Sequence, residues 1–161
     1  MNIHLARIGL LASTVVIYAA APPVAAADVA GRIKAVKGAV AVVREGRNTP
    51  AEAGMAVEVA DRVVTGVDGS VGIAMRDNTL LSAGPNSTLE LDKFAFDTTT
   101  HAGALDVSLK RGKLAVISGK IAKANPDAVR VSTPSVTLGV RGTEFIVETG
   151  LQDDSGAGGG Q

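Results

Sequence analysis

Apolar residues in this sequence alternate with polar or small ones, and this period of two constrains the fold more than any other feature. Val71, Ile73 and Met75 occupy every second position, and residues 105–109 repeat the spacing. Side chains of a β-strand point alternately to its two faces, so the spacing is typical of strands with one buried face. No segment shows a convincing helical period, and the nearest candidate, Pro50–Met55, is too short. The sequence therefore predicts an all-β domain.

Turn residues divide the alternating pattern into roughly a dozen short strands, as in sandwiches and barrels. The expected strands are residues 29–36, 39–43, 62–65, 71–75, 79–82, 88–91, 93–97, 104–110, 113–117, 129–131, 136–140 and 145–147. Asp68-Gly69-Ser70, Asp77-Asn78 and Arg111-Gly112 are expected to turn the chain. Ser118–Asp127 is the longest connection without an assignment. This pattern fits a compact β-sandwich, a roll or a short β-solenoid.

The first 27 residues have the features of a secretory signal peptide. Ile8–Ala21 is apolar, Pro22-Pro23 ends any helix there, and Ala25-Ala26-Ala27 fits the small-residue cleavage rule. An uncleaved N-terminal anchor is the alternative. We expect residues 1–27 to be a signal peptide, 28–149 a single β domain, and 150–161 a disordered Gly-rich tail. The protein is then periplasmic or secreted, with no integral membrane span after cleavage.

Composition excludes several classes of binding protein. The 16 basic and 16 acidic residues balance, which argues against a nucleic-acid surface or a polybasic membrane patch. Trp is absent, and Phe94, Phe96 and Phe145 are the aromatic residues after the signal segment. Sugar-binding modules and single-strand nucleic-acid platforms use stacking rings, so this scarcity argues against both. The chain has no cysteine, so packing and hydrogen bonds, not disulfides, must stabilise it.

Few residues suit catalysis or metal binding. His101 is the single histidine after the signal segment and lies in a polar stretch, and no Gly-x-Ser-x-Gly motif is present. Calcium at turns is conceivable, but no calcium-loop motif occurs, and aspartate caps turns far more often than it binds metal. We expect no catalytic residue, no metal and no cofactor. The aspartates near predicted turns are Asp61, Asp68, Asp77 and Asp97.

The stretch TPSVTLGVRGTEF raises the question of what Arg141 does. It combines a Thr133-Pro134 corner with Arg141, Gly142 and Thr143 inside an apolar run. In one reading the guanidinium folds against the sheet and donates to carbonyls or a carboxylate, and Gly142 supplies a backbone geometry that a Cβ disfavours. In the other it binds a carboxylate or phosphate through its planar fork. We favour the structural reading.

Several motifs, in order and spacing, resemble the FecR domain family over residues 31–147, and the threonine-proline and arginine-glycine-threonine ending is the most specific of them. They are Gly38, Asp61–Gly66, Gly69–Val71, Asp77–Leu80, Gly84–Ser87, Arg111–Leu114, Thr133-Pro134 and Arg141–Phe145. The regulator that names the family joins a cytoplasmic anti-sigma segment and a membrane span to a periplasmic sensing domain. The resemblance implies that this chain is similar to the extracytoplasmic domain, without anti-sigma activity.

What the resemblance implies about function is an exported, non-catalytic interaction or sensing module. We expect it to bind another cell-envelope protein, possible routes being strand addition and loop contacts, and to bind no nucleic acid. The expected surface includes the loop Thr98–Gly103 and the turns at Asp68-Gly69-Ser70 and Asp77-Asn78. The alternatives are a cell-wall or polysaccharide-associated binding module and, third, a hydrolase built on His101 or a carboxylate pair.

Overall fold

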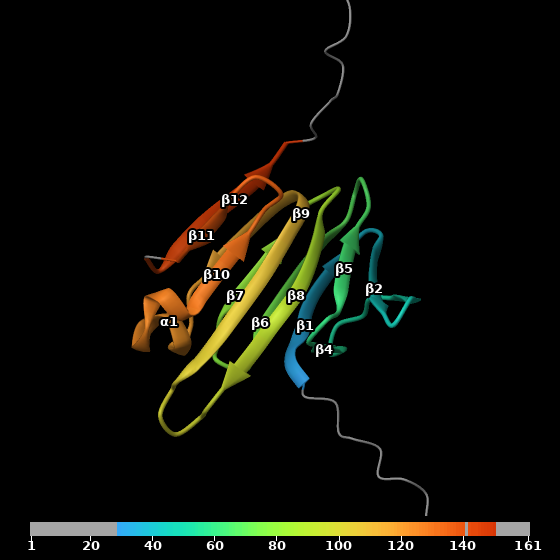
Figure 1. The fold of residues 1–161 in the computed structure, drawn as a ribbon. Helices are drawn as coiled ribbons and strands as arrows, with labels where there is room; N and C mark the ends of the chain where they lie inside the picture. Colours follow the sequence, from blue (N-terminus) through green and yellow to red (C-terminus); the bar gives the residue numbers. More distant parts are fainter. Residues whose placement is uncertain (1–28, 141, 151–161) are drawn as a thin grey trace, which may run out of the picture.

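The computed structural model describes residues 29–140 and 142–150, and these residues form an all-β fold (Figure 1). The expected signal peptide, residue 141 and the expected tail beyond Gly150 lie outside the described residues, so those predictions stay predictions. The strands are β1 (Val29–Lys37), β2 (Val40–Arg44), β3 (Arg47–Pro50), β4 (Ala56–Glu58), β5 (Arg62–Thr65), β6 (Ser70–Met75), β7 (Leu80–Ala83), β8 (Thr88–Phe96), β9 (Gly103–Ile117), β10 (Val129–Ser132), β11 (Thr137–Gly139) and β12 (Glu144–Thr149).

Consecutive strands join into long arms that bend in the middle. β7 and β8 are both antiparallel to β9: Ala83 pairs with Leu114, and Thr88 pairs with Arg111 after the bend. The same relation holds between the β5–β6 arm and the β7–β8 arm, and again for β1–β2 and β3–β4. One sheet is therefore folded along a line that crosses every arm.

The fold line divides the sheet into two half-sheets. The first half-sheet contains β4, β1, β6, β7, the C-terminal part of β9, and β12; the second contains β3, β2, β5, β8, the N-terminal part of β9, β10 and β11. Ile73 and Leu81 from the first face Val63, Leu89 and Val107 from the second around one nearly filled interior space. The architecture is thus the roll among the predicted alternatives, and the all-β prediction is confirmed.

Hydrogen bonds connect the bends of successive arms along the fold line. The Ala39 carbonyl accepts from Gly66 N at 2.8 Å, and the Gly66 carbonyl accepts from Asn86 N at 2.9 Å. Ser87 Oγ then accepts from Lys113 N at 3.0 Å and donates to its carbonyl at 3.2 Å. These contacts satisfy backbone groups that the bends remove from the strand ladders.

Glycine is required where a bend lies directly against its neighbour. Gly112 has φ +93, and a Cβ added there would lie 2.2 Å from Ser87 Oγ. The prediction that Arg111-Gly112 reverses the chain is wrong, because β9 continues through it from Gly103 to Ile117. A shift of pairing register between Thr88 and Leu89 absorbs the irregularity, so this glycine bends a strand and does not end it.

The connection left unassigned contains the helix α1 (Lys120–Ala124) and a 3-10 turn (Pro126–Ala128). Gly119 at the helix start provides no side-chain cap, and Asp77 takes that role from the β6–β7 turn. The Asp77 carboxylate accepts from Ile121 N at 3.3 Å, and its carbonyl accepts from Lys120 N at 2.8 Å. A helix this short depends on tertiary contacts, so the sequence shows no helical period.

The helix covers the open side of the roll, opposite the fold line. It links the end of β9 in the first half-sheet to β10 in the second, and in Figure 1 it lies at the left of the view, away from the bends. Ile121 is buried, and its side chain lies 3.0 Å from where a Cβ on Gly103 would be. Glycine at the start of β9 therefore leaves room for the helix.

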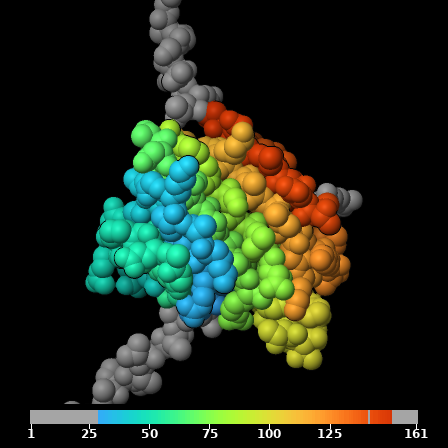
Figure 2. Space-filling model, turned by 180° about the vertical axis from the view of Figure 1, so that it is seen from behind, coloured from blue at the N-terminus to red at the C-terminus, as the bar shows by residue number. Residues whose placement is uncertain are grey.

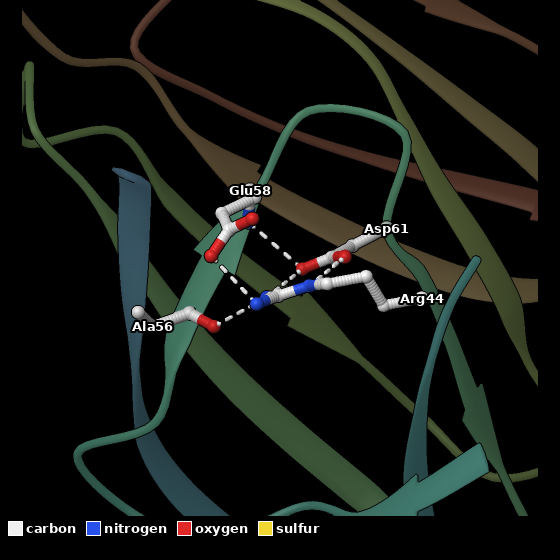
Figure 3. Close-up of polar contacts among 4 residues, drawn as sticks. All are labelled: Arg44, Ala56, Glu58 and Asp61. Atoms are coloured by element: carbon white, nitrogen blue, oxygen red, sulfur yellow. Dashed lines mark hydrogen bonds and ion pairs between the residues drawn. The ribbon is translucent and has the colours of Figure 1, made fainter. Parts of the chain in front are cut away.

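A cluster of polar contacts around Arg44 joins the two half-sheets at another point on the open side (Figure 3). Arg44 ends β2; its Nε and Nη2 donate to the two Asp61 oxygens at 2.7 and 2.6 Å, and its Nη1 donates to Glu58 at 2.6 Å. Nη2 also donates to the Ala56 carbonyl at 3.0 Å, so one guanidinium joins the second half-sheet to β4 of the first. The hydrogen bonds to Asp61 raise the pKa of Arg44 above its ordinary value.

Arg76 makes a second link across the open side. It donates to the Val29 carbonyl at the start of β1 at 3.2 Å and to the Phe96 carbonyl at the end of β8 at 3.4 Å. Its guanidinium carbon lies 5.8 Å from the centre of the Phe94 ring, a cation–π distance. The two half-sheets are thus joined by backbone contacts along the fold line and by charged side chains along the open side.

The fold line can be tested with Gly112→Ala. A non-glycine residue in left-handed backbone costs about 1–3 kcal/mol, and the new methyl would overlap Ser87, so we expect the free energy of unfolding to fall by at least about 2 kcal/mol. Gly139→Ala is the control, because a Cβ there meets nothing within 4 Å, and we expect a change within about 0.5 kcal/mol. Urea unfolding measures both, and equal effects would contradict the fold-line role.

The Arg44 cluster can be tested with Arg44→Met. Asp61 is 1% exposed, and removing its partner leaves a buried charge, which costs about 3–5 kcal/mol. Because the Arg44 side chain is 39% exposed, we expect a loss at the lower end, about 3 kcal/mol. The control is Arg62→Met, whose exposed pair with Glu90 spans 3.5 Å and should contribute less than about 1 kcal/mol. A loss no larger than the control's would show that Asp61 does not need Arg44.

Candidate interaction surface

The predicted turn residues lie within the framework of the roll. Asp68 lies in the bend between β5 and β6, where its carboxylate accepts from Ala39 N at 3.3 Å. Gly69 is buried against the Ala39 carbonyl, and Ser70 begins β6. These residues hold the bend of one arm against the next. Of the three residues of this turn, Asp68 is exposed to a partner, Gly69 is buried and Ser70 is half-buried.

The second predicted turn, Asp77-Asn78, supplies the residue that caps the start of α1. Asp77 is fully buried, with one carboxylate oxygen accepting from Thr79 N at 3.1 Å and the other from Thr79 Oγ1 at 2.7 Å. Asn78 has φ +67, a left-handed conformation that asparagine tolerates. The Asp77 carboxylate therefore contributes to the fold and is not part of an exposed surface.

The polar loop between β8 and β9 is ordered by Asp97. Its carboxylate accepts from the backbone N–H groups of Thr99 and Thr100, each at 2.8 Å. The bond from Thr100, with that from Thr99, lowers the pKa of Asp97 because both favour the charged form. His101 stacks on Phe96 with ring centres 6.2 Å apart. The loop is exposed, and these contacts give His101 a stacking role at the end of β8.

The aspartates considered for metal binding have separate roles. Asp61 binds Arg44, Asp77 caps α1, Asp68 accepts from Ala39 N in the neighbouring bend, and Asp97 bonds within its own loop. Across residues 29–140 and 142–150, no three His, Asp or Glu side chains come together in a metal-binding arrangement.

The residues of the closing motif join two different parts of the chain. Thr133 Oγ1 accepts from Val136 N at 3.1 Å, so Thr133 and Pro134 form the tip of the β10–β11 hairpin. The carbonyls of Gly142 and Thr143 accept from the Ser118 hydroxyl and N–H, both at 2.8 Å. Gly142 has φ +139 and Thr143 leads into β12. Arg141 lies outside the described residues, so both readings of its side chain remain predictions.

β9 has a second edge, and β10 and β12 share it. β10 runs parallel to residues 105–108, whereas β12 runs antiparallel to residues 112–117. Between them, residues 109–111 of β9 have no strand partner on this edge within the described chain. An open groove of about 590 Å³ lies at this gap. Its lining consists of Lys110, Arg111, Thr133, Pro134, Ser135, Val136, Leu138, Ile146, Val147, Glu148, Thr149 and Gly150.

Apolar side chains are exposed along the groove. Val136 is 49% exposed, Leu138 38% and Ile146 62%. The sequence predicts a strand over residues 136–140, whereas the observed strand β11 covers Thr137–Gly139 and is exposed along its length. This strand belongs to a hairpin at the margin of the sheet, and of the apolar residues of the predicted strand only Val140 reaches the core.

The groove also carries polar groups that the fold leaves unused. Arg111 is exposed and has no ion pair within the described residues, whereas Lys110 lies 3.9 Å from Glu90 and Glu148 lies 3.1 Å from Lys113. The hydroxyl of Thr149 is buried in the groove wall without a hydrogen-bond partner in the same part of the chain. Sequence reasoning assigned Arg111 to a turn, and no local signal marks it as part of a groove.

Two free strand edges border the groove. Within the described residues β11 pairs with β10 alone and β12 pairs with β9 alone, so each has one edge of unpaired backbone groups. Such edges are templates for pairing with another strand. Exposed apolar side chains, an unpaired guanidinium and two free edges together suit an extended peptide.

Comparison with protein families matches residues 61–157 to the family described as FecR protein. A search of the curated proteins and a search of the solved structures each gave no match. None of the helices in the described part of the chain has the length and apolar character needed to cross a membrane. The family match covers the β5–β12 part of the roll, including three of the bends, the groove and the closing motif, and the chain belongs to the FecR family.

Proposed function

We propose that this chain is an exported, non-catalytic FecR module that binds another cell-envelope protein and takes part in sensing or signalling. The observation that carries the proposal is the groove between the β10–β11 hairpin and β12. It combines free strand edges with the exposed side chains of Val136, Leu138 and Ile146, and with Arg111, which forms no ion pair among the residues that the structure describes. Membership of a regulatory family supports a binding role.

The mechanism we propose is strand addition. An extended segment of the partner pairs its backbone with the free edge of β11 or β12, and its apolar side chains cover Val136 and Leu138. Main-chain hydrogen bonds supply affinity, and the groove selects side chains. A carboxylate on the partner would pair with Arg111 through the planar guanidinium fork.

The aromatic residues favour a protein partner over a glycan. Phe94, Phe96 and Phe145 are partly buried and pack against the core, so none presents an open face of the kind that stacks on sugars. This weakens the alternative of a cell-wall or polysaccharide-binding module.

The charged groups support a non-catalytic role over a hydrolase. The closely packed carboxylates, Glu58 and Asp61, are both bound by Arg44, so neither is free to act as acid or base. His101 stacks on Phe96 in an exposed loop, with Asp97 engaged by backbone N–H groups.

Binding at the groove can be tested by site-specific photo-cross-linking. We expect a photoreactive phenylalanine analogue at Leu138 to cross-link one distinct envelope protein in living cells, and Arg111→Glu to reduce that product at least about tenfold, in line with about 1.5–3 kcal/mol for a hydrogen bond to a charged group. The same analogue at Val67, which is 79% exposed at a bend, is the control. No distinct product at Leu138, or the same product at Val67, would contradict the proposal.

Export can be tested separately. We expect the full chain, expressed with its own N-terminal segment, to accumulate outside the cytoplasm with Asp28 as its first residue, because Ala25-Ala26-Ala27 fits the cleavage rule. Cell fractionation and intact-mass measurement check both points. Recovery of the uncleaved chain in the membrane fraction would favour the N-terminal anchor instead.

A further inference from the structure

The outer face of the first half-sheet is uncovered in the described part of the chain. Figure 2 shows β1, β6, β7, the end of β9 and β12 side by side on this face. Its centre is made of small residues, and three large apolar side chains stand above them: Leu80 at 41% exposure, Ile117 at 43% and Ile146 at 62%. The small residues are Gly72, Ala74, Ser82 and Ala115.

The strand register arranges these side chains in rows across the sheet. One row runs from β1 to β12 through Arg32, Ala74, Leu80, Ile117 and Glu144. The next row runs through Ala35, Gly72, Ser82, Ala115 and Ile146. In both rows the large apolar side chains lie toward β12, and the residues next to or on β1, apart from Arg32, are small.

Charge is also divided between the two margins of the face. Arg32 and Lys34 are exposed on β1, whereas Glu144 and Glu148 are exposed on β12. Arg32 donates to the Gly54 carbonyl at 3.1 Å, and neither Arg32 nor Glu144 forms an ion pair within the described residues. A hollow of about 430 Å³ lies at the basic margin, lined by Arg32, Lys34, Ala74 and Arg76 among others.

We propose that this face binds a second copy of the chain, related by a two-fold axis that lies between the two copies, parallel to the strands and over β7. β7 is the middle of the five strands from β1 to β12, with β4 lying beyond β1, so this axis places β1 of each copy against β12 of the other. Arg32 and Glu144 lie in one row, and the axis keeps each row at its own height. Arg32 therefore meets Glu144 of the second copy, twice per dimer.

The sizes of the facing side chains are also complementary in this dimer. Ile117 of one copy enters the hollow at Ala74 of the other, Ile146 covers Ala35, and Leu80 packs on its own counterpart near the axis. A two-fold axis across the strands would instead place β12 opposite β12, so that the exposed glutamates of the two copies, Glu144 and Glu148, lie on facing strands, which is repulsive. Sheets pack about 10 Å apart when small and large side chains interleave in this way. Charge and size are thus complementary between the face and itself, which favours a second copy over another partner.

The size of the face determines how strongly we expect the two copies to associate. Four gaps between five strands, at about 4.8 Å each, give a width of about 20 Å, which is small for a permanent dimer. We therefore expect a dimer that dissociates on dilution. The face does not use Arg111 or Leu138, so the inference is independent of the groove proposal; Ile146 borders both surfaces and is not used in either test.

The experiment is sedimentation velocity of the full chain, purified after expression with its own N-terminal segment, over a range of concentrations. We expect Arg32→Glu and Glu144→Arg each to weaken the dimer at least about tenfold, because each places two like-charge pairs in it. Mixed one to one, the two variants should form a heterodimer as stable as the wild-type dimer, since both cross-interface pairs are then opposite in charge. Arg47→Glu, on an exposed strand of the second half-sheet, is the matched control.

Leu80→Glu provides a second test, with Val67→Glu as its control at another exposed apolar residue. We expect the first to be monomeric and the second to dimerise as the wild type does, with unchanged melting temperatures for both. A monomeric wild type at every concentration would overturn the proposal. A mixture of the charge variants that stays monomeric would do so too. So would a dimer that persists in Leu80→Glu, which would point to pairing through the free edge of β12.

Discussion

The structure depends on the line of backbone contacts where each arm of the sheet bends. Every arm leaves its strand ladder at the same level, and each loses regular partners there. Hydrogen bonds between neighbouring bends replace the lost strand pairing: the carbonyls of Ala39 and Gly66 and the hydroxyl of Ser87 each accept from a backbone N–H of the next bend. Glycine lets the bends approach closely enough for this to happen, as at Gly112. Because all bends coincide, the two half-sheets face each other and one core forms between them.

Within residues 29–140 and 142–150, the opposite side of the roll has no such continuous backbone connection, and side chains and a short helix close it. Arg44 and Arg76 each reach from one half-sheet to the other, and Asp77 holds the start of α1. Burying Asp61 and Asp77 is tolerated because each carboxylate receives several hydrogen bonds. The consequence for function is that most of the densely placed charge belongs to the fold. Arg111 takes part in none of these contacts, so it indicates a binding surface better than the charged clusters around Arg44 and Asp77 do.

The alternation of apolar residues predicted most strands and the fold class, because it depends only on which face of a strand is buried. It could not tell a bend from a reversal. Arg111-Gly112 carries the residues of a turn, yet its neighbours on both sides stay paired with one arm. It also could not show the parallel pairing of β10 with β9 or the capping of α1 by Asp77, since both join residues distant in sequence. The exposure of Val136 and Leu138 follows from that pairing, so the groove was invisible for the same reason.

β9 determines where a partner can bind. One edge of this strand supports the long arms, and the other is divided between β10 and β12, which leaves the groove at the bend. Val29, where the described chain begins, lies at the opposite end of the first half-sheet, and Figure 1 shows the two ends far apart. In the proposed dimer the axis runs along the strands, so both grooves lie at the same height along it. A partner with two extended segments would then bind both copies at once, and the second contact would form at a high effective concentration. Weak association through a small face would in that case be strengthened by the partner itself, which links dimer formation to binding.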